Sequence, residues 1–224
     1  MPRLRYVSGR GVRNVCMALA LIFSAPAWAD PVKLVALGDS LTAGYGLAPE
    51  DGFVPQLQGW LAAQGREVVV VNAGVSGDTT AGGLSRLDWS LTPDTKGLIV
   101  ELGGNDMLRG LAPAEARANL EAILKGAKAR GVPVLLVGMQ APGNYGADYK
   151  TAFDAIYPDL AAQYDAVLVP SFFAPLTQGG DPAAAQGMMQ ADGIHPNPEG
   201  VKKIVAALGP KVIDLLGRIQ SPAP

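Results

Sequence analysis

The sequence predicts an open α/β sandwich, in which helices cover both faces of a parallel β-sheet. Five apolar segments rich in Val and Leu recur along the chain, and near-continuous apolar runs are typical of strands buried on both faces. Segments with apolar residues at helical spacing lie between them, which suits a sheet built with right-handed crossovers. No repeat, low-complexity tract or linker divides the sequence, so a single domain is expected.

The first 29 residues have the pattern of a secretory signal peptide. Four arginines (Arg3, Arg5, Arg10 and Arg13) precede the short apolar run VCMALALIFSAP, and the small-x-small motif AWA follows it. The apolar run is too short to span a membrane comfortably, although a retained anchor helix is the alternative. We expect cleavage after Ala29 and export as a soluble protein, either periplasmic or secreted.

Residues 30–224 are then the mature chain, which suits one domain with a sizeable core. The signal segment holds four of the 18 basic residues and none of the 20 acidic ones, so the mature net charge is −6 (14 basic against 20 acidic residues). The absence of a basic patch or basic helix excludes a nucleic-acid-binding protein. With one His and no Cys after Cys16, a structural zinc site is excluded, and no cofactor is expected. The oligomeric state is open, although no surface stripe demands a partner.

Strands and helices are expected to alternate along the mature chain. The strands are expected at residues 32–37, 67–72, 97–102, 132–139 and 166–169. After the first strand a helix is expected at residues 53–64. Apolar stripes mark the next three helices: Ala81, Leu84, Leu87 and Leu91; Ala116, Leu120, Ile123, Leu124 and Ala127; and Phe153, Ile156, Leu160 and Tyr164.

Prolines and an asparagine give the limits of the later helices. Pro158 predicts a kink in the helix that contains Phe153. The last helix is expected to start after Asn197, a favourable N-cap, with Pro198 at its first position. Gly209 with Pro210 predicts a break or bend in that helix. The segment 170–197 before it is long and irregular, and loops of that length are often functional.

Polar residues follow each expected strand, and open α/β sheets bind ligands beyond the carboxyl ends of their strands. The segments after the first four strands are GDSLTAGYG, NAGVSGDT, GGNDMLRG and QAPGNYG. The fifth strand leads into the long segment, which contains ADGIHPNPEG. All five connections should therefore meet at one edge of the sheet.

Three of these residues have the chemistry of a nucleophilic catalyst. A serine attacks well only when a base removes its proton, and His195 is the only side chain that titrates near neutrality without perturbation. Asp192 lies three residues before His195 and can turn back to Nδ1, which would fix the imidazole. Ser40, His195 and Asp192 therefore have the roles of a Ser–His–Asp triad.

An acyl-transfer site also needs hydrogen-bond donors where negative charge develops on the carbonyl oxygen. The candidates are the backbone N–H groups of Ser40 and Gly77 and the side-chain amide of Asn105. Glycine at position 77 lets the main chain approach a substrate without a Cβ in the way. These three groups are the predicted oxyanion hole.

The segments GDSLT, SGDT, GGND and DGIHP, in this order, resemble the four sequence blocks of the SGNH (GDSL) hydrolase family. ELGGNDMLRGL and PGNYG are most similar to the bacterial periplasmic thioesterase, lysophospholipase and arylesterase group. The resemblance covers residues 32–212 and implies a flavodoxin-like three-layer α/β/α fold with a five-stranded parallel sheet. It further implies hydrolysis of esters and thioesters, without metal, on a small-molecule or lipid ester substrate. It also implies that residues 107–112 help to accept the acyl chain, and the substrate-binding candidates are Met107, Leu108, Leu111, Pro142 and Tyr145.

Other interpretations stay open at this point. A carbohydrate O-deacetylase of the same family is the alternative enzyme, and a non-catalytic ligand-binding module is the alternative from another class. Met188 and Met189 either line the acyl pocket or fill gaps in the core. Asp39 is expected to brace the turn that carries Ser40. Near-matches to the G-x-S-x-G, dinucleotide-binding and phosphate-loop motifs each lack a required residue.

Overall fold

Five parallel strands form one sheet in the computed structural model, which describes Met1, residues 31–177 and residues 182–220. Their order is β2-β1-β3-β4-β5. The strands are β1 (Val32–Gly38), β2 (Val68–Gly74), β3 (Gly97–Glu101), β4 (Val134–Val137) and β5 (Val167–Val169). The predicted five-stranded parallel sheet is confirmed. Apart from Met1, the predicted signal peptide lies outside the described residues.

The sheet changes its direction of growth beside β1. From β1 the chain moves to β2 on one side and then crosses to β3 on the other. In register, Gly38 at the end of β1 pairs with Gly74 on β2 and with Glu101 on β3. Connections that leave in opposite directions open a crevice at such a point. The carboxyl end of β1 is therefore the expected place for a ligand.

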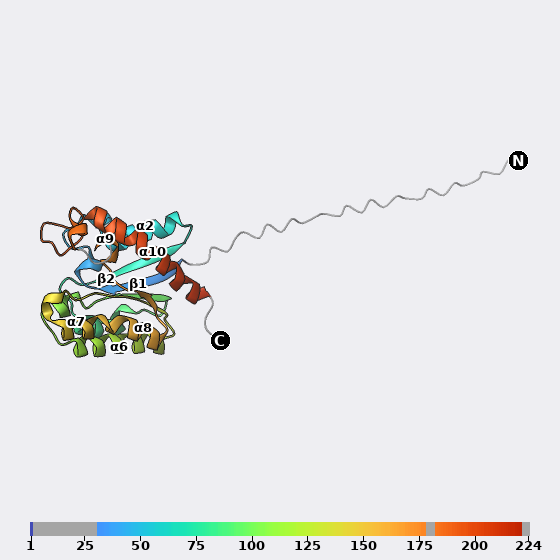
Figure 1. Cartoon of the computed structure of the whole chain (residues 1–224). Helices are drawn as coiled ribbons and strands as arrows, with labels where there is room; N and C mark the ends of the chain where they lie inside the picture. Colours follow the sequence, from blue (N-terminus) through green and yellow to red (C-terminus); the bar gives the residue numbers. More distant parts are fainter. Residues whose placement is uncertain (2–30, 178–181, 221–224) are drawn as a thin grey trace. The chain divides into compact units, whose positions relative to one another are not determined.

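Helices cover both faces of the sheet, and Figure 1 shows α2, α9 and α10 on one side with α6, α7 and α8 on the other. The elements of the first half are α1 (Ser40–Ala43), η1 (Pro49–Asp51), α2 (Phe53–Ala63), α3 (Thr80–Ser85), α4 (Leu87–Ser90) and α5 (Gly104–Leu108). Those of the second half are α6 (Pro113–Ala129), η2 (Gly143–Tyr145), α7 (Ala147–Asp154), α8 (Ile156–Tyr164), α9 (Ala174–Thr177), η3 (Pro182–Ala185) and α10 (Pro198–Gln220). The three-layer sandwich is confirmed. None of the helices in the described ranges is long and apolar enough to cross a membrane.

Several helix limits differ from those expected, and the helix predicted to span Ala81 to Leu91 is divided into α3 and α4 at Arg86. The helix over residues 153–164 is interrupted at Ala155, because Pro158 lies in the first turn of α8, where proline is tolerated, and its ring excludes a helical turn before it. The break expected at Gly209 and Pro210 does not occur, since α10 continues to Gln220. Buried residues after Pro210 keep the last turns packed, and a Cβ at Gly209 would lie 2.5 Å from the Trp60 ring, so glycine allows α10 to approach α2.

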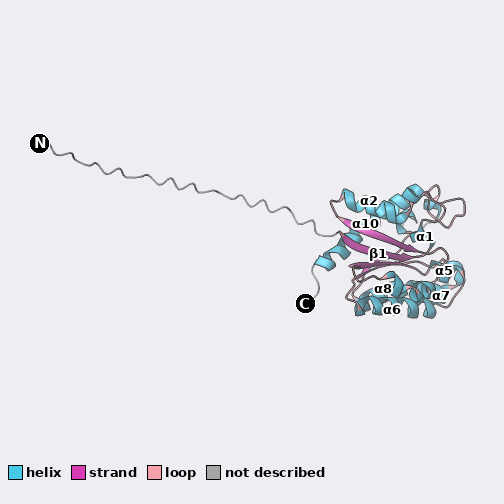
Figure 2. Cartoon of the chain, turned by 180° about the vertical axis from the view of Figure 1, so that it is seen from behind, coloured by secondary structure: helices cyan, strands magenta, loops and turns pink. Residues whose placement is uncertain are grey.

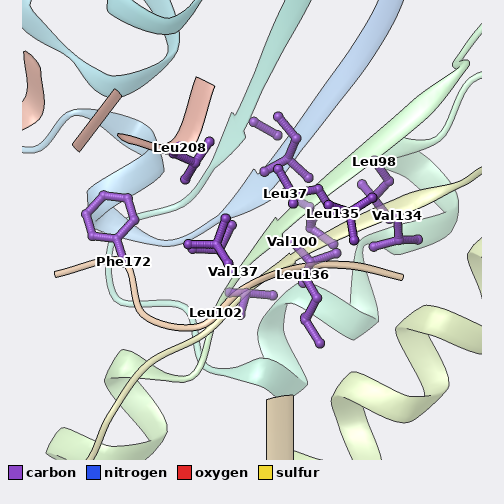
Figure 3. Packing of buried hydrophobic residues seen from close by; sticks show 14 of the residues in the cluster. Leu37, Leu98, Val100, Leu102, Val134, Leu135, Leu136, Val137, Phe172 and Leu208 are labelled. Carbon is purple, nitrogen blue, oxygen red and sulfur yellow. The ribbon is translucent and has the colours of Figure 1, made fainter. Parts of the chain in front are cut away.

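The core lies between the sheet and the two helical layers. Figure 3 shows strand residues such as Leu98, Val100 and Leu136 packed together, with Phe172 and Leu208 near one face. All five side chains are buried. Burial of such a side chain contributes about 1.5–3 kcal/mol relative to exposure. A core of this kind fixes the strand ends, and with them the loops that carry the polar segments.

Candidate active site

Ser40 begins a short helix directly after β1. The Asp39 side chain caps α1, because its Oδ1 accepts a hydrogen bond of 3.0 Å from the backbone N–H of Leu41. A Cβ at Gly38 would lie 2.0 Å from Thr42 Oγ1, so only glycine allows the strand and helix to meet this closely. The turn therefore presents Ser40 at the carboxyl edge of the sheet. Figure 2 shows α1 and α5 at this same end of the molecule.

His195 and Asp192 lie in a tight loop before α10. Met189 and Pro196 form an antiparallel bridge across the base of this loop, and the Asn197 side chain caps α10 by accepting a 3.0 Å bond from Gly200 N–H. The predicted N-cap is therefore present. The antiparallel bridge and the capped start of α10 therefore hold the loop that carries the His195 imidazole in place.

Ser40, His195 and Asp192 form a continuous chain of hydrogen bonds. Nε2 of His195 lies 2.8 Å from Ser40 Oγ, and Nδ1 lies 2.6 Å from Asp192 Oδ2. Because a carboxylate only accepts hydrogen bonds, we assign the proton to Nδ1, which leaves the Nε2 lone pair for the serine hydroxyl. The structure thus brings together the three residues that the sequence predicted as a triad.

Asp192 is held as a carboxylate by donors of its own loop. Its Oδ1 accepts bonds of 3.0 Å from His195 N–H and 2.9 Å from Ile194 N–H. The backbone N–H of His195, then the imidazole, then the N–H of Ile194 lower the pKa of Asp192 to about 2. The aspartate therefore keeps its negative charge at any pH at which such an enzyme normally works.

The three predicted oxyanion donors line the same cavity. Gly77 has a φ of +86°, a conformation that favours glycine, and its carbonyl accepts a 2.6 Å bond from Arg109 Nη2. Asn105 Nδ2 donates a 3.0 Å bond to Asp39 Oδ2. Since an amide carries two N–H groups, this contact orients the side chain and leaves a second donor for a ligand.

The cavity has a volume of about 650 Å³ and a mostly apolar lining. Of the substrate-binding candidates, Met107, Leu108 and Pro142 line it. Leu111 and Tyr145 are not among its lining residues. The carbonyl of Leu111 accepts a bond from the Tyr149 hydroxyl, and the Tyr145 ring stacks on that of Tyr149 with centroids 5.0 Å apart. Both residues therefore support the loops of the cavity from outside.

Several cavity residues were not expected from the sequence. Met188 and Met189 both pack against the core, and of the two only Met189 is among the residues that line the cavity. The Tyr45 ring lies 4.7 Å from the imidazole of His195. The wall also includes Leu41, Met139, Phe173, Ala185 and Ile194. The aromatic and methionine content of the irregular segment 170–197 was a partial signal, because Phe173 and Met189 line this wall while Phe172 is buried in the core.

Residues that could hold a metal ion were sought among the same side chains. Within residues 31–177 and 182–220, no group of three or more His, Cys, Asp or Glu side chains is arranged as metal ligands. The polar groups of the cavity include a hydroxyl nucleophile, its base, neutral donors and the carboxyl group of Asp39. This arrangement can transfer an acyl group.

Comparison with known proteins agrees with this chemistry. Residues 36–203 match the GDSL-like Lipase/Acylhydrolase family. The chain is 44% identical over 202 residues to Esterase TesA of Pseudomonas aeruginosa, which covers 90% of this chain and 96% of that protein. It is 40% identical over 181 residues to Thioesterase 1/protease 1/lysophospholipase L1 of Escherichia coli, which covers 80% of this chain and 81% of that protein.

A solved structure gives the same result for the fold. The structure of a psychrotrophic esterase EstA from Pseudoalteromonas sp., inhibited by monoethylphosphonate, superposes with a TM-score of 0.73 at 31% sequence identity. The match covers 83% of this chain and 98% of that one.

Proposed function

Because this chain belongs to the GDSL-like lipase/acylhydrolase family and is an ester-hydrolysing enzyme, we propose that it hydrolyses carboxylic esters and thioesters through an acyl-enzyme on Ser40. The observation that carries the proposal is the chain of hydrogen bonds from Ser40 Oγ through His195 to Asp192. Aryl and acyl esters are the proposed substrates, with acyl-CoA and lysophospholipids as further members of the class.

The first half of the reaction forms the acyl-enzyme. Ser40 Oγ bonds to the carbonyl carbon while Nε2 of His195 takes the hydroxyl proton. Asp192 stabilises the imidazolium that forms. The bond to the leaving alcohol or thiol then breaks, and His195 donates its proton to that group. Water repeats the same steps and releases the acid, so no proton or electron is gained or lost overall.

The reaction also requires stabilisation of the oxyanion that forms on the substrate carbonyl oxygen. The backbone N–H groups of Ser40 and Gly77 and the amide of Asn105 are the proposed donors. All three groups are uncharged hydrogen-bond donors, so they can stabilise the developing negative charge without a counter-ion. Their positions are fixed before substrate binds: Asp39 orients Asn105, and Arg109 bonds to the carbonyl of Gly77.

The apolar cavity favours acyl esters over the alternative O-deacetylase. An acetyl group would leave most of a 650 Å³ cavity without contacts, whereas a longer acyl chain would bury apolar surface at about 25 cal/mol per Å². Kinetics on a series of p-nitrophenyl esters, acyl thioesters and lysophospholipids tests this. We expect kcat/KM to rise from acetyl toward medium-chain esters, and a strict acetyl preference would select the deacetylase.

Covalent labelling separates an enzyme from a binding module. A phosphonate monoester inhibits the Pseudoalteromonas esterase, and an activated serine should react with the same class of reagent. We expect a fluorophosphonate probe to label the protein once, with mass spectrometry locating the adduct on Ser40. A protein that only bound ligands would remain unlabelled under the same conditions.

Replacing Asn105 with alanine removes one proposed oxyanion donor and leaves the triad untouched. We expect kcat to fall by about 10²–10³-fold with a small change in KM, because the lost hydrogen bond matters mainly in the transition state. Asn144→Ala, in the exposed turn after β4, is the control and should retain wild-type kcat. A change confined to KM would place Asn105 in ground-state binding instead.

The pH profile of kcat/KM should show that a single group must be deprotonated for activity. Protonation of His195 removes the lone pair that accepts the serine proton, so kcat/KM should fall tenfold per pH unit on the acid side. Asp192 adds no second step, because its pKa is lowered to about 2 and it stays ionised through this range. A limiting slope of two would show that another group must also be deprotonated.

We further propose that the protein is exported, on the basis of the signal-peptide pattern in residues 1–29. Expression of the full chain in a bacterium, followed by fractionation and N-terminal sequencing, checks this. The expected product lies in the periplasm or the medium and begins at Asp30. A cytoplasmic product that retained its first residues would contradict the proposal.

A further inference from the structure

Glu101 is a buried carboxyl group behind the nucleophile that the proposed reaction does not use. It ends β3 and pairs in register with Gly38, one residue before the turn that carries Ser40. Its side chain is fully buried. Oε2 accepts a 2.8 Å hydrogen bond from the hydroxyl of Thr42 on α1. Oε1 has no hydrogen-bond partner among the described residues.

The charged group that acts on Glu101 has the same sign. Asp39 is 2% exposed, and its charge acts on Glu101. Arg86 reaches the same end of β1, but its guanidinium is occupied by the carbonyls of Gly38 and Ala73 and by Asp78. A buried carboxylate with a free oxygen, beside another carboxylate, would be very unfavourable.

A single shared proton resolves this conflict. Burial and then the charge of Asp39 raise the pKa of Glu101 well above its usual range. Burial also raises the pKa of Asp39, while hydrogen bonds from the N–H of Leu41 and from the side-chain amide of Asn105 lower it again. Glu101 is the more deeply buried of the two, and one of its oxygens has no partner among the described residues, so Glu101 is the group that keeps the proton.

We propose that Glu101 is a positioning residue that acts as a neutral carboxylic acid, and that Glu101 and Asp39 form an acid pair that shares one proton and fixes Asn105 and α1 around Ser40. The inference rests on the proposed function. Glu101 bonds to α1 through Thr42, and Asp39 bonds to Asn105. The acid pair therefore joins the nucleophile helix to a proposed oxyanion donor.

The total charge of the acid pair matters because Asp39 bonds directly to Asn105, a proposed oxyanion donor. A second negative charge behind Asn105 would oppose the oxyanion that forms in front of it. The proton on Glu101 limits the acid pair to one charge. Other titratable groups of this region are Tyr157 on α8, Asp106 on α5, Asp154 on α7 and His195, which acts on Asp39.

Glu101→Gln tests the inference, because the amide has the shape of the acid, can still accept the hydrogen bond from Thr42 and cannot ionise. We expect kcat at neutral pH to stay within about threefold of wild type, because Gln, like the protonated acid, carries no charge and keeps the contact with Thr42. At alkaline pH, wild-type kcat should fall as Glu101 loses its proton, with little change in KM. The kcat of Glu101→Gln should stay constant to a higher pH than that of wild type. Glu115→Gln, on the exposed start of α6, should keep the wild-type profile.

Infrared spectroscopy supplies a measurement that does not depend on turnover. At neutral pH, the wild-type protein with 13C-labelled Glu side chains should show the carbonyl band of one protonated carboxylic acid, and Glu101→Gln should lack it. Absence of the band from the wild type would overturn the inference, even if the protein is an esterase. So would an unchanged alkaline fall in a folded Glu101→Gln variant. If that variant does not fold, the pH titration of the band in the wild type decides alone.

The two proposals fail in different ways. A protein that shows the protonated band but neither hydrolyses esters nor reacts with the phosphonate probe would remove the proposed function and leave the acid pair as a structural feature. An active esterase without the band would retain the function and remove the role of Glu101.

Discussion

Ser40→Ala is expected to lower kcat on a p-nitrophenyl ester by at least ~10⁴-fold while leaving the protein folded, because removal of the nucleophile of a serine triad costs about this much or more. Ser40 is the hydroxyl that lies 2.8 Å from Nε2 of His195. In the proposed reaction its Oγ forms the bond to the substrate, so no other contact of the cavity replaces it. Residual hydrolysis would come from the oxyanion donors and from substrate binding alone.

Ser76→Ala is the matched control. Ser76 lines the same cavity and loses the same atom, but its side chain is exposed and lies in the turn before Gly77, away from the triad hydrogen bonds. It should retain wild-type kcat within about twofold. Circular dichroism and thermal melting should show the same fold in both variants. Near-normal turnover by Ser40→Ala would mean that another group attacks the substrate.

Asp192→Asn is expected to lower kcat by about 10⁴-fold, the loss seen when the orienting carboxylate of a triad becomes an amide. The carboxylate accepts a hydrogen bond of 2.6 Å from Nδ1–H of His195. An amide can present its NH2 group there instead, which favours the tautomer with hydrogen on Nε2. That tautomer cannot accept the proton of Ser40. The imidazolium of the transition state also loses its counter-charge.

Asp94→Asn is the control for the loss of an exposed carboxylate. Asp94 bonds to Lys33 and its pKa is lowered, as that of Asp192 is, but it does not contact the imidazole. It should retain wild-type kcat. Because Asp192 keeps its charge down to about pH 2 in the wild type, the deficit of Asp192→Asn should be present across the whole working pH range. A deficit that appeared only at high pH would contradict the assigned role.

The sequence predicted the sheet and the meeting of the triad for the same physical reason. Strands buried on both faces must be apolar along their length, so they are visible as runs, and parallel strands send all their carboxyl ends to one edge. A single histidine in the chain then left one candidate base. The position of Ser40 after the first strand and of His195 after the fifth followed from these two facts.

Features that depend on packing between distant segments could not be predicted. The continuation of α10 through Pro210 depends on buried contacts of its last turns, and no local pattern reports them. Phe173 and Tyr45 belong to the cavity only because separate loops meet there. Glu101 was visible as one acidic residue inside an apolar run, but its neutral form follows from Asp39 beside it, which the sequence alone does not place.

The 155 residues that separate Ser40 from His195 have a consequence for biosynthesis. A nascent or translocating polypeptide holds its nucleophile long before the ribosome supplies the base, so hydrolysis cannot start until the C-terminal segment has been released and docked. Proteolytic fragments that contain only Ser40 or only His195 should be inert. Recovery of their activity on mixing would report that the two pieces had reassembled, which makes catalysis a sensitive indicator of complete folding.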